Sequence, residues 1–242
     1  KFDFWGLGES VMDRNLSDKV RYAKEKGFTN LAIATNVDLL TEEISVKLFK
    51  AGIDTIIFSI DGATKETQES IRVKTDFNRV VDNAEKAIAA RDKGNFKTKF
   101  VFRFIRQAIN KAEWEDFREY WGSRISREKG DETIGYDAHS WGGEIDGIVE
   151  ATNAVKVPES VPCHHVFDRL VVLSDGTIPL CCADFHHAEN AYGNIDDASP
   201  IEIFNSDIAR RTRKIHLSGK RNDMEICANC TILDSEASQE VE

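Results

Sequence analysis

The sequence predicts an α/β fold: an open or partial parallel barrel, followed by a small α+β module. Short apolar runs alternate with helical patterns at a spacing of about 25–30 residues, which is typical of βαβ units and a parallel sheet. The cysteines are confined to a later stretch, between Cys163 and Cys230. Because the predicted strands are too few for a closed eight-stranded barrel, we expect a barrel that lacks its opening β/α unit.

The expected barrel elements follow from the apolar runs and the residues that interrupt them. Strands are predicted at residues 1–6, 28–34, 54–60, 97–105 and 133–138. The run 28–34 carries no charged residue, as expected of a buried parallel strand. Helices are predicted at residues 16–26, 41–51, 77–93 and 112–121. The first two are each followed by a glycine, which is a common residue at helix C-termini.

The later module has a different pattern. Residues 169–174 and 177–180 are expected to form a β-hairpin around Asp175-Gly176, and residues 200–217 a helix. We therefore divide the chain into a partial barrel, a linker, a cysteine module and an acidic tail, at residues 1–145, 146–162, 163–233 and 234–242.

Composition excludes several classes of function. The 242 residues carry a net charge of −10, which argues against nucleic-acid partners and against binding to anionic membranes. No apolar run approaches the roughly 20 residues that span a bilayer. No export signal is visible, so a cytoplasmic protein is expected, with thiols that bind metal rather than form disulfides.

The five cysteines form the strongest chemical signal. Cys227 and Cys230 form a C-x-x-C turn, which places two sulfurs on one side of a tight loop and suits zinc or one face of an iron–sulfur cluster. Cys163 and either Cys181 or Cys182 complete four ligands and leave one thiol over. The spacing alone leaves both metals open.

Polar motifs follow three of the predicted strands. They are Gly6-Leu-Gly8-Glu9-Ser10, Thr35-Asn36-Val37-Asp38-Leu39-Leu40 and Ser59-Ile60-Asp61-Gly62. Strand C-termini share one rim in parallel α/β folds, and ligands bind at that rim. Taken alone, the first motif is better explained as a tight βα turn. All three at regular spacing are hard to assign to packing.

In this order the motifs resemble the GGEP-like, TNG-x-LL-like and SIDG-like motifs of the radical S-adenosylmethionine (radical SAM) superfamily. Ser70-Ile-Arg72-Val and the stretch from Arg106 to Glu113 match further segments of that family. The resemblance implies a partial (β/α)6 barrel and a set of residues near S-adenosylmethionine. Gly8 and Glu9 would bind its amino group, Asn36 would lie near it, Ser59 would contact the ribose, and Arg72 would contact the carboxylate.

The chain departs from the family pattern in three places. Ser10 and Val37 replace the usual proline and glycine. The C-x3-C-x2-C motif that holds the family's catalytic 4Fe–4S cluster is missing, and the first residue is Lys1 rather than Met. We expect an upstream truncation, a radical SAM cluster only when that segment is present, and no activity from the chain as written. The alternative is a degenerate, non-catalytic homologue.

The cysteine module resembles the auxiliary-cluster domain called SPASM, or its short form, twitch. The resemblance implies one auxiliary 4Fe–4S cluster, and the spacing from Gly176 selects Cys181 over Cys182. The implied ligands are Cys163, Cys181, Cys227 and Cys230. A zinc-binding structural module is the alternative. Neighbouring histidines are expected beside the site rather than as ligands; they are His164, His165, His186 and His187.

The resemblance implies an enzyme that generates a 5′-deoxyadenosyl radical for hydrogen abstraction. A cluster with four cysteine ligands has no open iron, which suits electron transfer in a two-electron oxidation. The segment from Gly176 to Phe185 resembles members that dehydrogenate sugar- or aminocyclitol-like small molecules. Maturation of a ribosomal peptide is the alternative. A reductant such as flavodoxin or ferredoxin is implied as partner.

For two smaller features, the sequence is compatible with more than one role. Trp141-Gly142-Gly143 is expected either to line a substrate pocket or to anchor a loop. Asp184 is expected to cap the hairpin, with a role as proton acceptor as the alternative.

Overall fold

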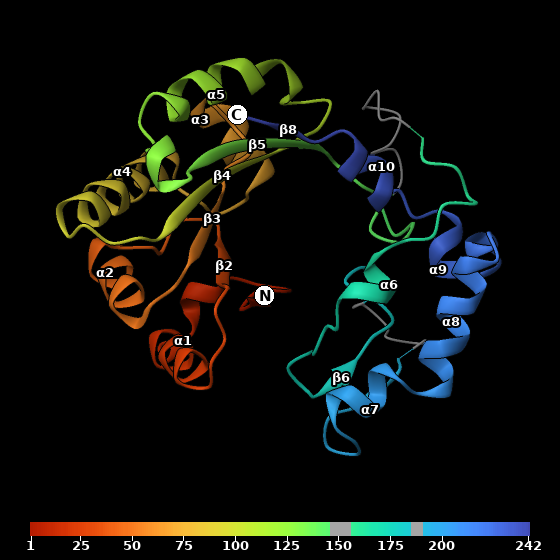
Figure 1. Cartoon of the computed structure of the whole chain (residues 1–242). Helices are drawn as coiled ribbons and strands as arrows, with labels where there is room; N and C mark the ends of the chain where they lie inside the picture. The colour runs from red at the N-terminus through yellow and green to blue at the C-terminus, as the bar shows by residue number, and fades with distance from the viewer. Residues whose placement is uncertain (146–155, 185–190) are drawn as a thin grey trace. The chain divides into compact units, whose positions relative to one another are not determined.

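The computed structural model describes residues 1–145, 156–184 and 191–242 (Figure 1). It divides into two compact units. Unit 1 comprises Lys1–Tyr136 and Gln239–Glu242, and unit 2 comprises Asp137–Ser238. The observed division falls just after Tyr136, before the boundary at 145 expected from the sequence. The expected linker 146–162 is described only from residue 156 onward.

Among the described residues, unit 1 contains a six-stranded sheet in the order β1-β2-β3-β4-β5-β8. The strands are β1 (Phe2–Asp3), β2 (Leu31–Thr35), β3 (Thr55–Ser59), β4 (Lys99–Arg106), β5 (Glu132–Asp137) and β8 (Glu240–Val241). Strands β1 to β4 pair in parallel, whereas β8 is antiparallel to β5. This mainly parallel sheet confirms the expected α/β class.

The helices of unit 1 lie along the outer side of the sheet (Figure 1). They are α1 (Leu16–Glu25), α2 (Glu42–Ala51), α3 (Lys65–Ile71), α4 (Phe77–Lys93) and α5 (Trp114–Gly122), with 3-10 turns η1 (Ser10–Met12), η2 (Lys111–Glu113) and η3 (Arg127–Lys129). Thr41, Thr64 and Asp76 cap α2, α3 and α4 by accepting backbone N–H groups with their side chains. The short helix α3 was not expected from the sequence.

The two faces of the sheet have different roles. Phe58 belongs to the large core beneath the helices, whereas Ile57 and Val101 belong to a small cluster on the opposite face. Side chains alternate between faces along a strand. Ser59 and Arg103, which are partners in the β3–β4 register, therefore lie on the face away from the helical core.

Unit 2 is built from short elements around a smaller core. They are α6 (His165–Asp168), β6 (Thr177–Ile178), β7 (Gly193–Asn194), α7 (Pro200–Phe204), α8 (Asp207–Leu217), η5 (Arg221–Asp223), α9 (Glu225–Ala228) and α10 (Ile232–Ala237). The buried core residues are Val166, Ile178, Leu180, Tyr192, Ile203 and Ala209.

Three elements of unit 2 differ from the sequence expectation. The hairpin pairs β6 with β7, and residues 169–174 form no strand, although Leu173 donates its N–H to the carbonyl of Thr177 at 2.8 Å. The expected helix 200–217 is two helices, since Ser206 caps a new helix by accepting the N–H of Ala209.

The C-terminal residues 234–242 do not form a simple tail. Leu233, which is buried, anchors α10, and Ile134 and Gly135 pair with Val241 and Glu240. None of the described helices is long and apolar enough to cross a membrane.

Candidate functional site

The strand ends of unit 1 bring Glu9 and Asn36 together. The Glu9 carboxylate accepts the backbone N–H of Val11 at 3.0 Å and that of Asn36 at 2.7 Å. Gly8 has a φ of +87°, and no atom lies within 4 Å of the position a Cβ would occupy. The loop after β1 is thereby tied to the end of β2, and its glycine leaves open space beside the fixed carboxylate.

Val37 holds an unusual backbone conformation at the end of β2. Its φ is +71°, in the left-handed region, and its side chain is fully buried. A β-branched residue there is strained, which explains why glycine is the usual residue at this position of the motif. Asn36 stabilises the turn, because its Oδ1 accepts the N–H of Asp38 at 3.1 Å.

Two arginines contact polar side chains at the end of β3 and just after it. Arg103 donates from Nη2 to the Ser59 hydroxyl at 2.6 Å, and Arg72 pairs with Asp61 at 2.6 Å. Burial and the nearby positive charge of Arg72 lower the pKa of Arg103, with Asp61 opposing them. The sequence singled out Ser59 and Arg72, and the structure places Arg103, which the sequence analysis did not name, in contact with Ser59. The available signal was an arginine inside the otherwise apolar run of β4.

The arginines keep hydrogen-bonding capacity for a ligand. The Nε atoms of Arg72 and Arg103 are buried and find no hydrogen-bond partner in the described part of the chain. Guanidinium groups with free donors bind carboxylates strongly. The strand ends of unit 1 thus present Glu9 as a fixed acceptor and two arginines with free donors.

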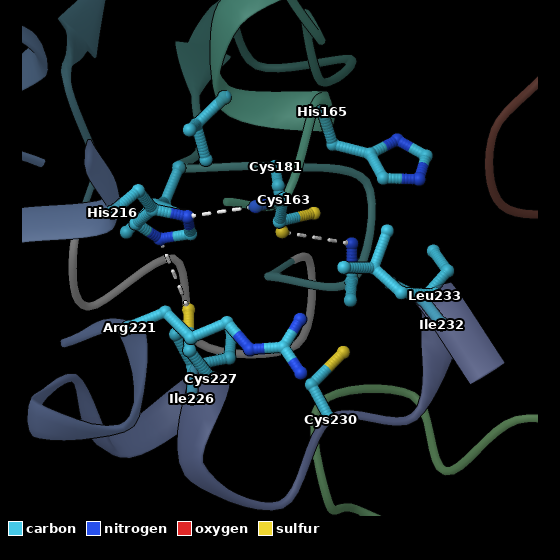
Figure 2. Close-up of a pocket in the computed structure, with 13 residues that line it drawn as sticks. Cys163, His165, Cys181, His216, Arg221, Ile226, Cys227, Cys230, Ile232 and Leu233 are labelled. Carbon is cyan, nitrogen blue, oxygen red and sulfur yellow. Dashed lines mark hydrogen bonds between the residues drawn. The ribbon is translucent and has the colours of Figure 1, made fainter. Parts of the chain in front are cut away.

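In unit 2, four cysteines line one pocket (Figure 2). They are Cys163, Cys181, Cys227 and Cys230, and the same pocket is lined by His216, Arg221 and apolar side chains that include Val166, Leu180, Ile226 and Leu233. Cys163 precedes α6, Cys181 follows β6, and the C-x-x-C pair spans α9 and the residues after it. Residues far apart in the sequence thus converge on one enclosed apolar space.

Cys182 does not line this pocket. Its sulfur lies 3.8 Å from Nδ1 of His165 instead. Burial favours the neutral His165 ring, but the contacts with Cys182 and Glu236 outweigh it and raise the pKa of His165 to about 9. The expected histidines 186 and 187 lie outside the described residues.

The pocket disfavours bare thiolates and therefore suits a cation. Burial raises the pKa of Cys163 to about 11 and that of Cys227 to about 12, and it also raises the pKa of Cys181 and Cys230. A metal removes these protons, because coordinated thiols are deprotonated. Four thiolates around a cluster carry excess negative charge, which a nearby cation would offset.

Arg221 supplies that positive charge. It is 8% exposed, and its Nη2 donates to the carbonyl of Val157 at 3.1 Å. Its Nε is buried and has no hydrogen-bond partner among the described residues. The free donor fits an anionic group in the pocket.

The spread of the sulfur atoms favours a cluster over a single zinc ion. Tetrahedral zinc with bonds of about 2.3 Å requires sulfurs about 3.8 Å apart. Within the described residues, the set of metal-binding side chains whose ligand atoms all lie within 4.8 Å is His164, His165 and Glu236, and it contains no cysteine. Among the described residues, no three cysteine sulfurs therefore lie as close together as the ligands of one zinc ion.

Local contacts hold the cysteine loops in place. The N–H of Ala183 lies 3.4 Å from the sulfur of Cys181, and His216 contacts both Cys163 and Cys227. Asp184 accepts the N–H of Leu180 at 3.1 Å, which agrees with its expected role as a cap.

The Trp141-Gly142-Gly143 motif packs against the C-x-x-C loop. A Cβ on Gly142 would lie 2.9 Å from Cγ1 of Ile226. The Ser140 hydroxyl donates to the carbonyl of Asn229 at 2.7 Å. These contacts favour the loop-anchor interpretation of the motif, because the glycines permit close approach to the segment between Cys227 and Cys230.

Two protein-family models match the chain. The radical SAM superfamily matches residues 2–117, and SPASM, an iron–sulfur cluster-binding domain, matches residues 163–231. The first covers the strand-end site of unit 1, and the second contains all five cysteines.

Curated relatives align over shorter stretches. A tungsten-containing aldehyde ferredoxin oxidoreductase cofactor-modifying protein of Pyrococcus furiosus is 41% identical over 58 residues, which are 24% of this chain and 16% of that protein. A probable GTP 3′,8-cyclase of Saccharolobus islandicus is 33% identical over 81 residues, or 34% of this chain and 26% of the relative. The alignments therefore span about a quarter or less of these relatives.

Solved structures share the fold over most of the chain. The crystal structure of BtrN in complex with AdoMet and 2-DOIA has a TM-score of 0.59 at 20% identity, covering 94% of this chain and 71% of BtrN. Streptococcus suis SuiB has a TM-score of 0.55 at 14% identity, covering 94% of this chain and 60% of SuiB.

Proposed function

Because this chain belongs to the radical SAM superfamily and carries an iron–sulfur cluster-binding domain, we propose that the protein oxidises a small molecule by radical chemistry, with an auxiliary cluster as electron acceptor. S-adenosylmethionine and 4Fe–4S clusters are the cofactors of these two domains. The proposal depends on one observation above all, the four cysteines that line a single pocket in unit 2.

The auxiliary cluster would be held by Cys163, Cys181, Cys227 and Cys230. Cys181 lines the pocket, whereas Cys182 contacts His165, and this placement supports Cys181 as the ligand. Arg221 would offset the negative charge of the cluster and its thiolates. Four cysteine ligands would occupy every iron, so substrate could not bind to the cluster directly, and electron transfer is the role that remains.

S-adenosylmethionine would bind at the strand ends of unit 1. The Glu9 carboxylate, held by two backbone N–H groups, would accept hydrogen bonds from the ammonium group of the cofactor. The unpaired Nε donors of Arg72 and Arg103 would serve its carboxylate, and Ser59 and Asn36 would lie beside the ribose. Gly8 would leave room for close approach of the cofactor.

The two cofactors would supply the reactive species: S-adenosylmethionine a 5′-deoxyadenosyl radical that removes a hydrogen atom, and the auxiliary cluster an acceptor for one electron. The chain's own residues would bind and orient the cofactor, through Glu9 on one side and the arginines on the other. The apolar side chains around the cysteines would keep water from the auxiliary cluster.

Support for a small-molecule substrate comes from the segment between Gly176 and Phe185, whose Gly-x4-Cys-x-x-Asp-Phe pattern resembles aminocyclitol dehydrogenases of this family. The fold is shared with BtrN, which was crystallised with AdoMet and 2-DOIA. We propose a sugar- or aminocyclitol-like alcohol, which would become a ketone by losing its carbon-bound hydrogen atom to the radical, one electron to the auxiliary cluster and its hydroxyl proton to water. Flavodoxin or ferredoxin would act as reductant.

The test uses protein expressed from its complete coding sequence, purified and reconstituted without oxygen. It is incubated with S-adenosylmethionine and dithionite, with a panel of aminocyclitols in one arm and short peptides in the other. We expect 5′-deoxyadenosine, together with a ketone product from the first arm. A modified peptide would instead support the maturase alternative, and absence of 5′-deoxyadenosine in both arms would reject radical SAM activity.

A further inference from the structure

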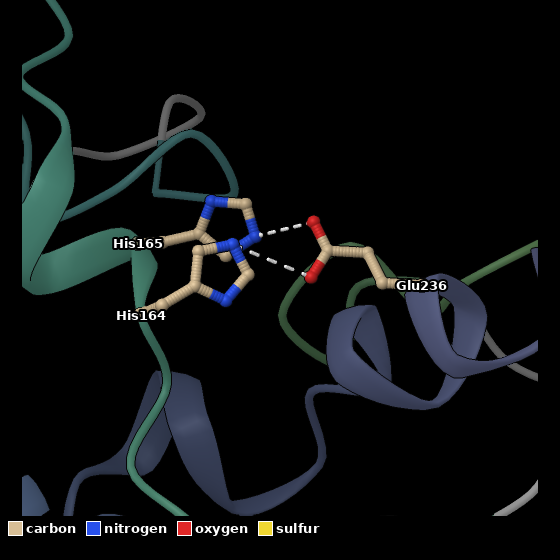
Figure 3. A group of neighbouring side chains, drawn as sticks. All are labelled: His164, His165 and Glu236. Carbon is tan, nitrogen blue, oxygen red and sulfur yellow. Dashed lines mark ion pairs between the residues drawn. The ribbon is translucent and has the colours of Figure 1, made fainter.

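A second group of metal-binding side chains lies beside the cysteine pocket in unit 2. His164 and His165 stack with ring centroids 4.3 Å apart, and both rings direct Nε2 toward Glu236 (Figure 3). Nε2 of His165 lies 2.9 Å from one oxygen of Glu236, and Nε2 of His164 lies 3.5 Å from the other. The three ligand atoms all fall within 4.8 Å of one another.

The Nε2 atom of His165 is buried and faces a carboxylate. The residue is 2% exposed, yet its buried Nε2 has no hydrogen-bond partner in the described chain. Glu236 contacts this nitrogen as an ion-pair partner at 2.9 Å, and the contact raises the pKa of His165. A divalent cation bound between the two side chains would replace the ring proton, because metal ligands bind in their deprotonated form.

The distances suit two ligands of one metal ion. Imidazole nitrogen and carboxylate oxygen each bind zinc at about 2.0–2.2 Å, so neighbouring ligands of a tetrahedral ion lie about 3.4 Å apart. The 3.5 Å separation between Nε2 of His164 and Glu236 matches that value, whereas the 2.9 Å separation between Nε2 of His165 and Glu236 is shorter. An ion placed in line with Nε2 of His165 would satisfy this atom without requiring a hydrogen bond to the carboxylate.

We propose that His164, His165 and Glu236 form a divalent metal site of the zinc class at the edge of the cysteine pocket, which His165 also lines. Two imidazoles and a carboxylate are ligands that zinc prefers, and thiolate is absent from the set. The side chains of His164 and Glu236 are 47% and 34% exposed, so water completes the coordination.

The site has a structural consequence within unit 2. His164 directly follows Cys163, the first cluster cysteine, and α6 begins at His165. Glu236 lies on α10, the helix that follows Cys230, the last cluster cysteine. A metal here clamps α6 to α10 and fixes the two chain segments that flank the cysteines.

The test measures zinc binding by cluster-loaded protein, in which the cysteines are occupied. Equilibrium dialysis and elemental analysis give the zinc stoichiometry, and X-ray absorption at the zinc edge gives the ligands. We expect one zinc per chain beyond the cluster iron, with nitrogen or oxygen at about 2.0–2.2 Å and no sulfur at about 2.3 Å. A sulfur shell would overturn the proposal.

Two variants and one control locate the site. His164→Gln and Glu236→Gln each should weaken zinc binding at least tenfold and abolish the rise in Tm that zinc causes, while cluster iron is retained. Both side chains are partly exposed, so the fold should tolerate the changes. Glu159→Gln, an exposed residue of the same unit, should behave like the parent. Equal zinc affinity in all three variants would reject the site.

Discussion

The imidazole Nε2 of His216 lies 3.7 Å from the sulfur of Cys227. The other nitrogen, Nδ1, accepts the backbone N–H of Cys163 at 3.2 Å, so the ring proton belongs on Nε2 and is directed at the sulfur. Burial, followed by the charge of Arg221, lowers the pKa of His216, which keeps the ring neutral. His216 is therefore a neutral donor to a proposed cluster ligand.

Replacing this donor should make the auxiliary cluster harder to reduce. Hydrogen bonds to ligand sulfurs raise cluster reduction potentials. A hydrogen bond of about 1 kcal/mol corresponds to roughly 40 mV for a one-electron couple. We expect His216→Phe to lower the potential by about that amount in a redox titration followed by electron paramagnetic resonance. Lys214→Arg, which keeps the charge of an exposed residue on the same helix and outside the pocket lining, is the control and should leave the potential unchanged.

The adjacent thiols Cys181 and Cys182 should differ sharply in their effect on the cluster. Cys181→Ala removes a residue that lines the pocket, so reconstituted protein should lose most of its iron and sulfide and its visible absorption. Cys182→Ala removes only the contact with His165 and should retain roughly four irons per chain. The opposite pattern would make Cys182 the ligand.

Arg103 should contribute to S-adenosylmethionine affinity although its position gave no motif. Charged hydrogen bonds contribute about 1.5–3 kcal/mol, so Arg103→Met should raise the dissociation constant roughly ten- to hundredfold. Equilibrium dialysis with labelled cofactor measures this change. Arg118→Met alters a more exposed guanidinium on α5 and serves as control. Unchanged affinity in Arg103→Met would separate this arginine from the cofactor.

Gly142 and Gly219 provide a matched pair for testing the loop anchor. Both have a φ of +71°, so alanine carries the same backbone strain at each position. The added Cβ meets Ile226 at 2.9 Å in Gly142→Ala but only ordinary contacts, 3.5 Å or more, in Gly219→Ala. We expect Gly219→Ala to cost about 1–2 kcal/mol of unfolding free energy, and Gly142→Ala about 1–3 kcal/mol more.

Denaturant unfolding of the two variants, followed by near-ultraviolet circular dichroism, gives this difference. Gly142→Ala should also lose cluster iron faster during air exposure, because Ile226 directly precedes Cys227. Equal destabilisation by the two substitutions would show that only backbone strain matters at position 142.

The sequence predicted the barrel elements well because their signals are local. The helix expected at residues 77–93 has those bounds in the structure, where Asp76 caps its first turn. The apolar run predicted at residues 28–34 overlaps β2, which is Leu31–Thr35. These patterns combine hydrophobic periodicity with capping residues, and both are readable within a few positions.

The predictions that failed concern residues whose interaction partners lie far away in the sequence. β6 was expected to pair with residues 169–174, yet it pairs with β7, and no local pattern specifies that choice. Arg103 was not predicted, because the role of a charged residue in a strand depends on which face of the sheet its side chain occupies. The Glu236 contact with His165 joins residues that flank the cysteines at opposite ends of the module.

The antiparallel pairing of β5 with β8 brings both ends of unit 2 to one place. The chain leaves the sheet after β5 and returns at β8, where Ile134 faces Val241 and Gly135 faces Glu240. Unit 2 is thus an insertion in the chain between β5 and β8, two neighbouring antiparallel strands of the sheet in unit 1. Because the two ends of unit 2 lie close together, we expect that another cluster-binding module could replace it between β5 and β8 without changing the order of strands in the sheet.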